Sequence, residues 1–206
     1  MKYMKASKFV EYLQSSGMTV FSVAEASRII GKSRKYASLY LSRLAGQGYI
    51  DRIEKGKFCL HGASIYAVAS NIKHPSYISM LAAFKYYGLT SQNISTIDVI
   101  SGSRHKPIEW MEYYVSFRKV PRKLIFGFYR SNEDGAFIAY FEKALIDSLL
   151  IGNIPLPYIE EAYRNAKDQN MIDDARLASF IKISGSKSLG NRIKSIEESI
   201  EEMAML

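Results

Sequence analysis

The residues with the most distinctive chemistry lie together in residues 33–44, SRKYASLYLSRL. If this segment is a helix, with about 100° between successive side chains, Ala37, Leu41 and Leu44 share one face and Tyr40 lies at its edge. The opposite face holds cations and hydroxyls and no carboxylate. A helix that only has to be solvated usually mixes both signs of charge on its outer face. The pattern therefore predicts a helix that binds a polyanion.

The net charge of the chain is concentrated in the same region. The 206 residues carry a formal net charge of +8, and 48% of them are hydrophobic, which is enough to build real cores. Residues 1–62 hold 11 Lys and Arg against 4 Asp and Glu, whereas residues 63–206 hold 17 against 16. A basic excess favours an acidic partner. We therefore expect double-stranded DNA to bind residues 1–62.

Three helices and a hairpin are expected to position the basic segment. A first helix covers residues 5–16, and a capping box formed by Ser22 and Glu25 opens a second one. Alternating apolar residues over 49–53 and 58–60 predict two strands joined by a tight turn. Helix, helix, turn, helix and hairpin is the order of a winged helix-turn-helix, whose third helix enters the DNA major groove.

Individual side chains of this predicted domain suit particular parts of a duplex. Arg34 and Lys35 can donate to guanine or to phosphate, and Leu39 can contact a thymine methyl group. A winged helix that serves only as a protein-interaction module is the alternative. The predicted DNA contacts are the outward positions of the helix and the wing: Ser33, Arg34, Lys35, Tyr36, Ser38, Leu39, Ser42, Arg43, Arg52, Lys55 and Lys57.

The rest of the chain predicts a larger α+β domain with a small sheet and a C-terminal helical tail. The expected domains are residues 1–62, a connector helix within 63–73, and residues 74–206. In the last of these, apolar periodicity predicts helices over 76–87, 141–151, 158–166, 173–183 and 189–203, and strands over 96–101, 113–117, 124–129 and 136–140.

Two segments of the larger domain allow more than one interpretation. The basic residues 118–123 could extend a DNA-contacting surface, bind an acidic partner, or form a solvated hairpin tip. Apolar residues at 189, 193, 196, 200 and 203 have heptad spacing, which suits packing either onto the same domain or onto another chain. The oligomeric state therefore stays open.

Patterns for catalysis, metal binding and membrane insertion are weak. The histidines His61, His74 and His105 have no metal-binding spacing, and Cys59 with His61 offers too few ligands for a metal site. The single cysteine excludes an intramolecular disulfide. We expect no cofactor and no metal. No apolar run approaches about 20 residues, and no signal peptide precedes the first helix, so we expect a cytoplasmic protein that contacts no membrane.

Two segments resemble AbiEi-type antitoxins. Residues 74–89, HPSYISMLAAFKYYGL, are similar to that family's Pro-x-Tyr-(Ile/Val)-Ser segment, and residues 141–150, FEKALIDSLL, are similar to its Glu-Lys-Ala-Leu-x-Asp helix. Phe141 stands in place of the usual proline, and Tyr86 and Tyr87 in place of a tyrosine–histidine type pair. With the winged helix, the resemblance covers roughly residues 5–165. Its motif residues are Pro75, Tyr77, Ser79, Gly88, Glu142, Lys143 and Asp147.

The resemblance implies a bipartite protein. Its winged helix would repress its own operon, and its larger domain would counter a nucleotidyltransferase-like toxin without necessarily touching it. The role of the motif residues stays open, although the i,i+4 spacing of Lys143 and Asp147 permits an ion pair and favours a structural anchor over a reactive site. A nuclease targeted by the winged helix and a protein-interaction adaptor are the competing classes. The operator, the toxin and its target stay open.

Overall fold

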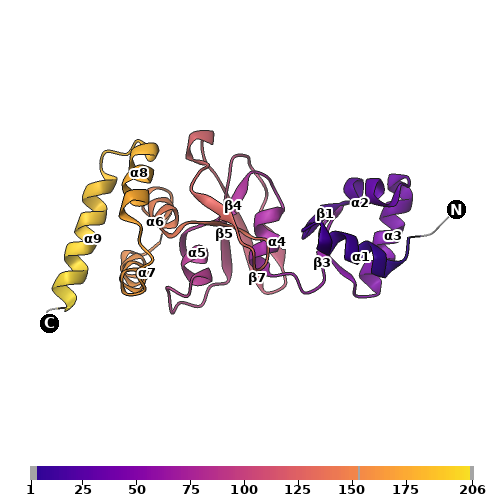
Figure 1. The fold of residues 1–206 in the computed structure, drawn as a ribbon, viewed down its shortest axis with the longest axis horizontal. Helices are drawn as coiled ribbons and strands as arrows, with labels where there is room; N and C mark the ends of the chain where they lie inside the picture. Colours follow the sequence, from indigo (N-terminus) through magenta and orange to yellow (C-terminus); the bar gives the residue numbers. More distant parts are fainter. Residues whose placement is uncertain (1–3, 153, 205–206) are drawn as a thin grey trace. The chain divides into compact units, whose positions relative to one another are not determined.

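The structure is a computed structural model that describes residues 4–152 and 154–204, and it confirms the α+β class (Figure 1). The chain forms two compact units. One unit contains the residues up to Ile72 together with Ser131–Ala136, and the other contains Lys73–Arg130 together with the residues from Phe137 onward.

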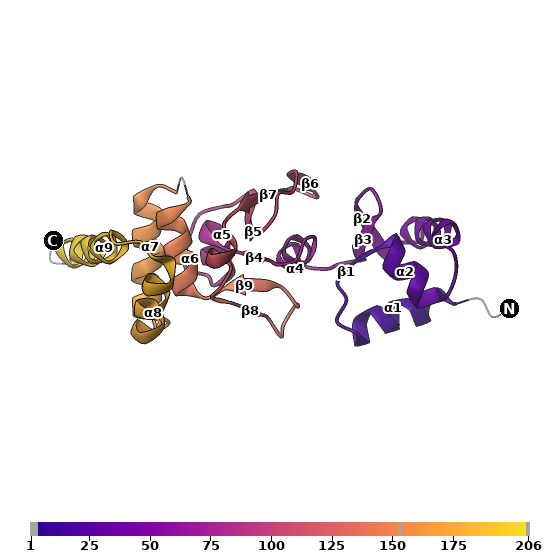
Figure 2. The ribbon, with the colours of Figure 1, turned by 90° about the horizontal axis from the view of Figure 1, so that it is seen from above.

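The first unit begins with three helices and a three-stranded antiparallel sheet, the arrangement of a winged helix-turn-helix. The strand order is β1-β3-β2, and Figure 2 shows the helices gathered beside this small sheet. The first strand, β1, was not predicted from the sequence because it has only three residues. The elements are α1 (Ala6–Ser15), β1 (Val20–Ser22), α2 (Val23–Ile30), α3 (Arg34–Gly46), β2 (Ile50–Glu54) and β3 (Lys57–Leu60).

Local hydrogen bonds explain where the helices begin and end. The Glu25 backbone N–H donates to Ser22 Oγ at 3.2 Å while the Ser22 N–H donates to Glu25 Oε2 at 2.7 Å, so the predicted capping box is confirmed. Gly31 ends α2 with a left-handed φ of +62°, which only glycine adopts without strain. Ser33 then caps α3 by accepting a hydrogen bond from the Tyr36 N–H at 3.2 Å.

Aromatic rings form the core of this domain. The Phe9 ring packs edge-on against Phe21 and Tyr40, with centroids 5.7 and 5.5 Å apart. Ala37 and Leu41 are fully buried beside them, which confirms the predicted inward face of α3. Tyr40, expected at the edge of that face, is buried as well. The core therefore fixes which side of α3 faces outward.

Helix α4 (Ile65–Asn71) follows the wing, and Ser64 caps it. The Ser64 hydroxyl donates to Asp134 at 2.5 Å, and the Asn71 amide donates to the Gly135 carbonyl at 3.1 Å. These bonds explain why Ser131–Ala136 groups with α4. The interpretation of residues 63–73 as a connector stays a prediction.

The second unit contains a six-stranded mixed sheet with the order β6-β7-β5-β4-β9-β8. Strands β5 and β7 run parallel, as do β4 and β9, and the other neighbours are antiparallel. The strands are β4 (Ser76–Ile78), β5 (Thr96–Ser101), β6 (Ile108–Trp110), β7 (Tyr113–Lys119), β8 (Phe128–Arg130) and β9 (Phe137–Ala139).

Helix α6 lies at the centre of the helical part of this unit. All nine of its residues from Phe141 to Leu149 are buried, because α5, α7, α8 and α9 all pack against it (Figure 1). The helices are α5 (Met80–Tyr86), α6 (Phe141–Leu150), α7 (Leu156–Asp168), α8 (Asp174–Ser184) and α9 (Leu189–Ala204), with a short 3-10 turn, η1 (Arg122–Leu124).

Three sequence predictions in this unit are wrong. Residues 76–87 do not form one helix, because Ser76–Ile78 is strand β4, held between β5 and β9. Residues 118–123 are not a hairpin tip, since β7 pairs with β5 and β6 rather than with β8. The expected strand over 124–129 is shortened to β8, because η1 extends through Leu124. Strand β6 was not predicted.

The apolar face of α9 packs within its own unit, one of the two alternatives open from the sequence. Leu189, Ile193, Ile196 and Ile200 are buried, and α9 contacts α6 and α7. The fifth heptad position, Met203, lies outside the residues whose side chains the structure describes.

Candidate nucleic-acid interface

The outward face of α3 is polar, basic and exposed. Arg34, Lys35, Ser38, Ser42 and Arg43 are all exposed on it, together with Ser33 just before the helix. Leu39 lies among them with 54% of its surface accessible. The structure thus brings seven of the predicted contacts onto one surface.

The cations of this face do not pair with an acidic side chain in the described part of the chain. Over residues 4–152 and 154–204, Arg34, Lys35 and Arg43 form no ion pair within the chain. Ser42 donates its hydroxyl to the Ser38 carbonyl at 3.0 Å. Unpaired cations on a rigid helix can donate to phosphate or to guanine without first breaking an internal contact.

The turn between α2 and α3 holds this helix at a fixed angle. The Ser27 hydroxyl donates to the Lys32 carbonyl at 2.5 Å, and the Lys32 N–H donates back to the Ser27 carbonyl at 3.1 Å. Tyr36, predicted as a DNA contact, is half-buried and packs partly against the core. Its ring therefore positions α3 as well as bordering the exposed face.

The two lysines at the tip of the wing differ: Lys55 is exposed, whereas Lys57 forms contacts within the fold. Lys55 is exposed beside Gly56, whose φ of +78° makes the turn and whose carbonyl accepts from the Val23 N–H at 3.1 Å. Lys57 instead pairs with Glu54 at 3.4 Å and donates to the Ile72 carbonyl. Among the described residues, Lys55 thus forms no ion pair, whereas Lys57 does.

Three other residues of this unit that the sequence analysis named, Arg52, Cys59 and His61, are buried or make contacts within the fold. Arg52 is exposed, and its Nε donates to the Glu54 carbonyl at 3.5 Å. Cys59 is buried, and burial raises the pKa of its thiol to about 12, so it stays protonated. His61 lies 3.1 Å from Asp51. In the described part of the chain, no three His, Cys, Asp or Glu side chains come together as metal ligands.

Four of the motif residues of the second unit meet in one buried cluster. Lys143 and Asp147, one turn apart on α6, form an ion pair in which each side chain is 1% exposed. Asp147 Oδ2 also accepts from the Ser79 hydroxyl at 2.7 Å and from the Tyr77 hydroxyl at 3.1 Å. The Lys143 ammonium lies 4.6 Å from the centre of the Phe126 ring. The cluster ties α6 to β4 and to the start of α5.

Burial acts on both charges of this pair. It lowers the pKa of Lys143 and raises the pKa of Asp147, while their mutual attraction opposes both shifts. Burial also raises the pKa of Tyr77, which therefore acts as a hydroxyl donor. All four side chains of the cluster are buried. The cluster can therefore hold β4, α5 and α6 together, but it offers no surface to which a macromolecule could bind.

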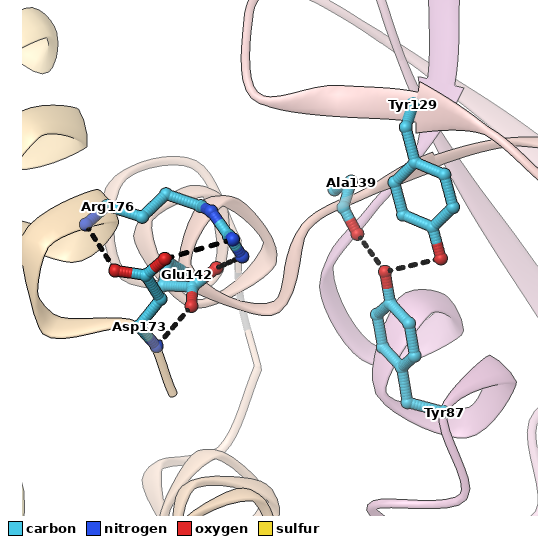
Figure 3. Close-up of polar contacts among 6 residues, drawn as sticks. All are labelled: Tyr87, Tyr129, Ala139, Glu142, Asp173 and Arg176. Atoms are coloured by element: carbon cyan, nitrogen blue, oxygen red, sulfur yellow. Dashed lines mark hydrogen bonds and ion pairs between the residues drawn. The ribbon is translucent and has the colours of Figure 1, made fainter. Parts of the chain in front are cut away.

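Glu142, the neighbouring motif residue, binds the start of α8 (Figure 3). It is fully buried and accepts from the Asp173 N–H at 2.7 Å and from the Arg176 guanidinium at 3.3 Å. Arg176 also pairs with Asp173 at 3.0 Å and lies 4.4 Å from the centre of the Tyr140 ring. Glu142 and Lys143 thus point to different partners although they are adjacent in sequence.

Two further motif residues, Pro75 and Gly88, and Tyr87, which differs from the family's motif, also lie where they stabilise the fold. Tyr87 donates its hydroxyl to the Ala139 carbonyl at 2.7 Å and contacts the Tyr129 hydroxyl at 3.3 Å, which joins α5 to β8 and β9 (Figure 3). Gly88 follows α5 with a φ of +70°, and Pro75 precedes β4 after a cis peptide bond. Sequence reasoning missed Tyr129, Asp173 and Arg176, because only the tertiary fold brings them to these motifs.

Comparison with known proteins matches the first unit. Residues 8–61 match the family described as "Transcriptional regulator, AbiEi antitoxin". A search of curated proteins found no match. One solved structure, described as the crystal structure of RV2827C protein from Mycobacterium tuberculosis, is 14% identical, with a TM-score of 0.49 over 89% of this chain and 72% of that one. No helix in the described residues is long and apolar enough to cross a membrane.

The family match lies outside the two segments, 74–89 and 141–150, on which the resemblance was first noted. It covers the three helices and the strands of the wing. Residues 8–61, which form the winged helix, are therefore similar to AbiEi antitoxin transcriptional regulators, the family that the sequence resembles.

Proposed function

We propose that this protein is a sequence-specific DNA-binding regulator that represses its own operon and acts by binding rather than by catalysis. The observation that carries the proposal is the outward face of α3. This face is exposed and basic, its cations form no ion pair with any described residue, and it lies within a domain that matches a regulator family. The partner is double-stranded operator DNA in the cytoplasm.

The proposed contacts divide between reading bases and holding the backbone. Arg34, Lys35 and Ser38 lie in the first half of α3, the part of a recognition helix that reaches base edges. Leu39 would meet a thymine methyl group. Ser33, Tyr36, Ser42 and Arg43 border this surface, while Arg52, Lys55 and Lys57 lie on the wing and would contact the backbone.

The second unit is proposed to counter a nucleotidyltransferase-like toxin. The support is the resemblance of residues 74–89 and 141–150 to AbiEi-type antitoxins, together with the match of residues 8–61 to that class. The motif residues are proposed to maintain the fold of this unit rather than to react, since Lys143, Asp147 and Glu142 are buried and hydrogen-bonded.

The recognition surface can be tested by fluorescence anisotropy with a duplex from the promoter of the protein's own operon and a scrambled duplex. Arg34→Ala, Lys35→Ala and Ser38→Ala should each reduce the preference for the promoter, a base contact being worth about 1–3 kcal/mol. Lys55→Ala should weaken binding to both duplexes and flatten the slope of log Kd against log salt by about one unit.

Lys182→Ala, which removes an exposed cation from α8, serves as the control and should bind like the unmodified chain. Because Lys57 is held by Glu54 and Ile72, Lys57→Ala should flatten the salt slope less than Lys55→Ala. An equal loss on both duplexes for every α3 variant would show that sequence is read elsewhere.

A further inference from the structure

A cavity of about 390 Å³ lies within the second unit, between the end of α6, the start of α7 and α9. These three helices contact one another and belong to the C-terminal part of the chain (Figure 1). Cavities that hold small molecules in proteins have volumes of about 300–1,000 Å³. The cavity is therefore large enough for a compact organic ligand, and its walls come from one unit only.

Helix α9 turns a largely polar stripe toward this cavity. Arg192, Ser195, Ile196 and Ser199 all line it, and their i, i+3, i+4 and i+7 spacing places them on one helix face. The serine side chains are too small to fill the space that leucine or isoleucine would occupy at the same positions. The cavity therefore stays open, and its wall carries hydroxyl groups and a guanidinium.

One anion and one cation of the cavity wall remain available to a ligand. Glu160, on α7, and Arg192 form no ion pair with any residue in the described ranges 4–152 and 154–204. Arg192 donates through Nη1 to the Leu149 carbonyl at the end of α6, which fixes its guanidinium and leaves its other N–H groups for a ligand. The cavity thus offers both signs of charge.

The remaining walls of the cavity are aliphatic. Leu149, Ile159 and Ile196 line it and are only 5%, 2% and 2% exposed, so they belong to the packed interior. Ile154 and Leu156 add hydrocarbon from the start of α7 and the residues before it. Among the described residues, the lining contains no aromatic ring on which a nucleobase could stack. These walls suit a branched aliphatic group.

We propose that this cavity binds a free α-amino acid with a branched aliphatic side chain, a ligand additional to the DNA and toxin considered above. Arg192 binds the carboxylate, Glu160 binds the ammonium group, and the aliphatic walls cover the side chain. A carboxylic acid without an amine leaves Glu160 without a partner, and a phosphate is repelled by it. A purely apolar molecule would take both charges out of water without hydrogen bonds.

The test is isothermal titration calorimetry of the full-length protein with L-leucine, L-isoleucine and L-valine. Three analogues each lack one recognised group: isocaproate lacks the amine, isoamylamine lacks the carboxylate, and glycine lacks the side chain. The cavity variants are Glu160→Gln, Arg192→Gln and Ser195→Leu, the last of which fills the space. Lys194→Gln, at an exposed position of α9 outside the cavity, is the control. Thermal unfolding checks that each variant folds, and the other two decide the outcome if Arg192→Gln unfolds.

At least one of the three amino acids should bind with a dissociation constant of about 1 mM or tighter and raise the unfolding temperature. Each analogue should bind about tenfold or more weakly, as should that amino acid to each cavity variant, because one charged hydrogen bond or the space for the ligand is lost. Lys194→Gln should bind like the unmodified chain. The inference is overturned if none of the three amino acids binds this tightly, if isocaproate binds equally well, or if Glu160→Gln and Ser195→Leu leave binding unchanged.

Discussion

Lys143 and Asp147 form an ion pair one helical turn apart inside α6, and each is 1% exposed. A charge removed from water is costly unless a partner offsets it, and here two hydroxyls add to the pairing. The i,i+4 spacing made the pair predictable from the sequence. The hydroxyls of Tyr77 and Ser79 were not predictable as its partners, because about 70 residues of chain separate them from Asp147.

Replacing one member of this pair should therefore destabilise the protein strongly. Lys143→Met or Asp147→Leu should each cost about 3–5 kcal/mol in the free energy of unfolding, because each leaves a buried charge without its partner. The double variant should cost less than the sum of the two single variants. Urea unfolding of the four proteins measures the coupling.

The exposed pair Lys194–Glu198 provides a matched control, since it has the same i,i+4 spacing and a distance of 3.6 Å on the surface of α9. Lys194→Met and Glu198→Leu should show a coupling of about 0.5 kcal/mol or less. A coupling at Lys143–Asp147 as small as this would contradict the role of the buried cluster.

Helix α8 is held at its first turn by the interaction of Arg176 with Glu142 and Asp173. Beyond its first turn, α8 packs along one face only. Leu177 and Ser184 are buried and the Phe180 ring lies 5.2 Å from the Phe126 ring, whereas residues 178, 179, 182 and 183 are exposed. The polar anchor at the first turn therefore adds to a limited apolar contact.

Arg176→Ala should therefore release α8 locally without unfolding the protein. Amide hydrogen exchange should speed up over residues 174–184, while α7 keeps its protection. Arg164→Ala, at an exposed position of α7, should leave both helices unchanged. Uniform acceleration over the whole second unit would instead show that Arg176 supports the global fold.

Elements with strong local signals were predictable, and those that depend on distant partners were not. The capping box at Ser22 and the glycine at 31 define α2 locally, and the wing turn at Gly56 does the same. Residues 76–78 carry a helix-compatible pattern but become β4, because two strands on either side complete its backbone hydrogen bonds. The parallel pairing of β5 with β7 leaves no trace in the sequence of either strand alone.

At the scale of the whole molecule, the chain combines a basic winged helix with a second unit that has its own buried residues. The proposed recognition face lies in the first unit, whereas the residues that resemble the antitoxin motifs lie in the second. Separate cores allow one unit to be altered without unfolding the other.

We therefore expect that repression and toxin neutralisation can be separated in the full-length chain. Arg34→Gln with Lys35→Gln should abolish repression of the operon promoter, because the base contacts are lost, and should leave the rescue of toxin-poisoned cells unchanged. A reporter gene behind the promoter and growth beside the neighbouring toxin gene measure the two activities. Full-length variants suit this test better than a fragment that begins at residue 74, since such a fragment would strip Ser131–Ala136 of the hydrogen bonds from Ser64 and Asn71. Loss of both activities in a folded Arg34 and Lys35 variant would mean that neutralisation works through the promoter, and the second unit would then need another role.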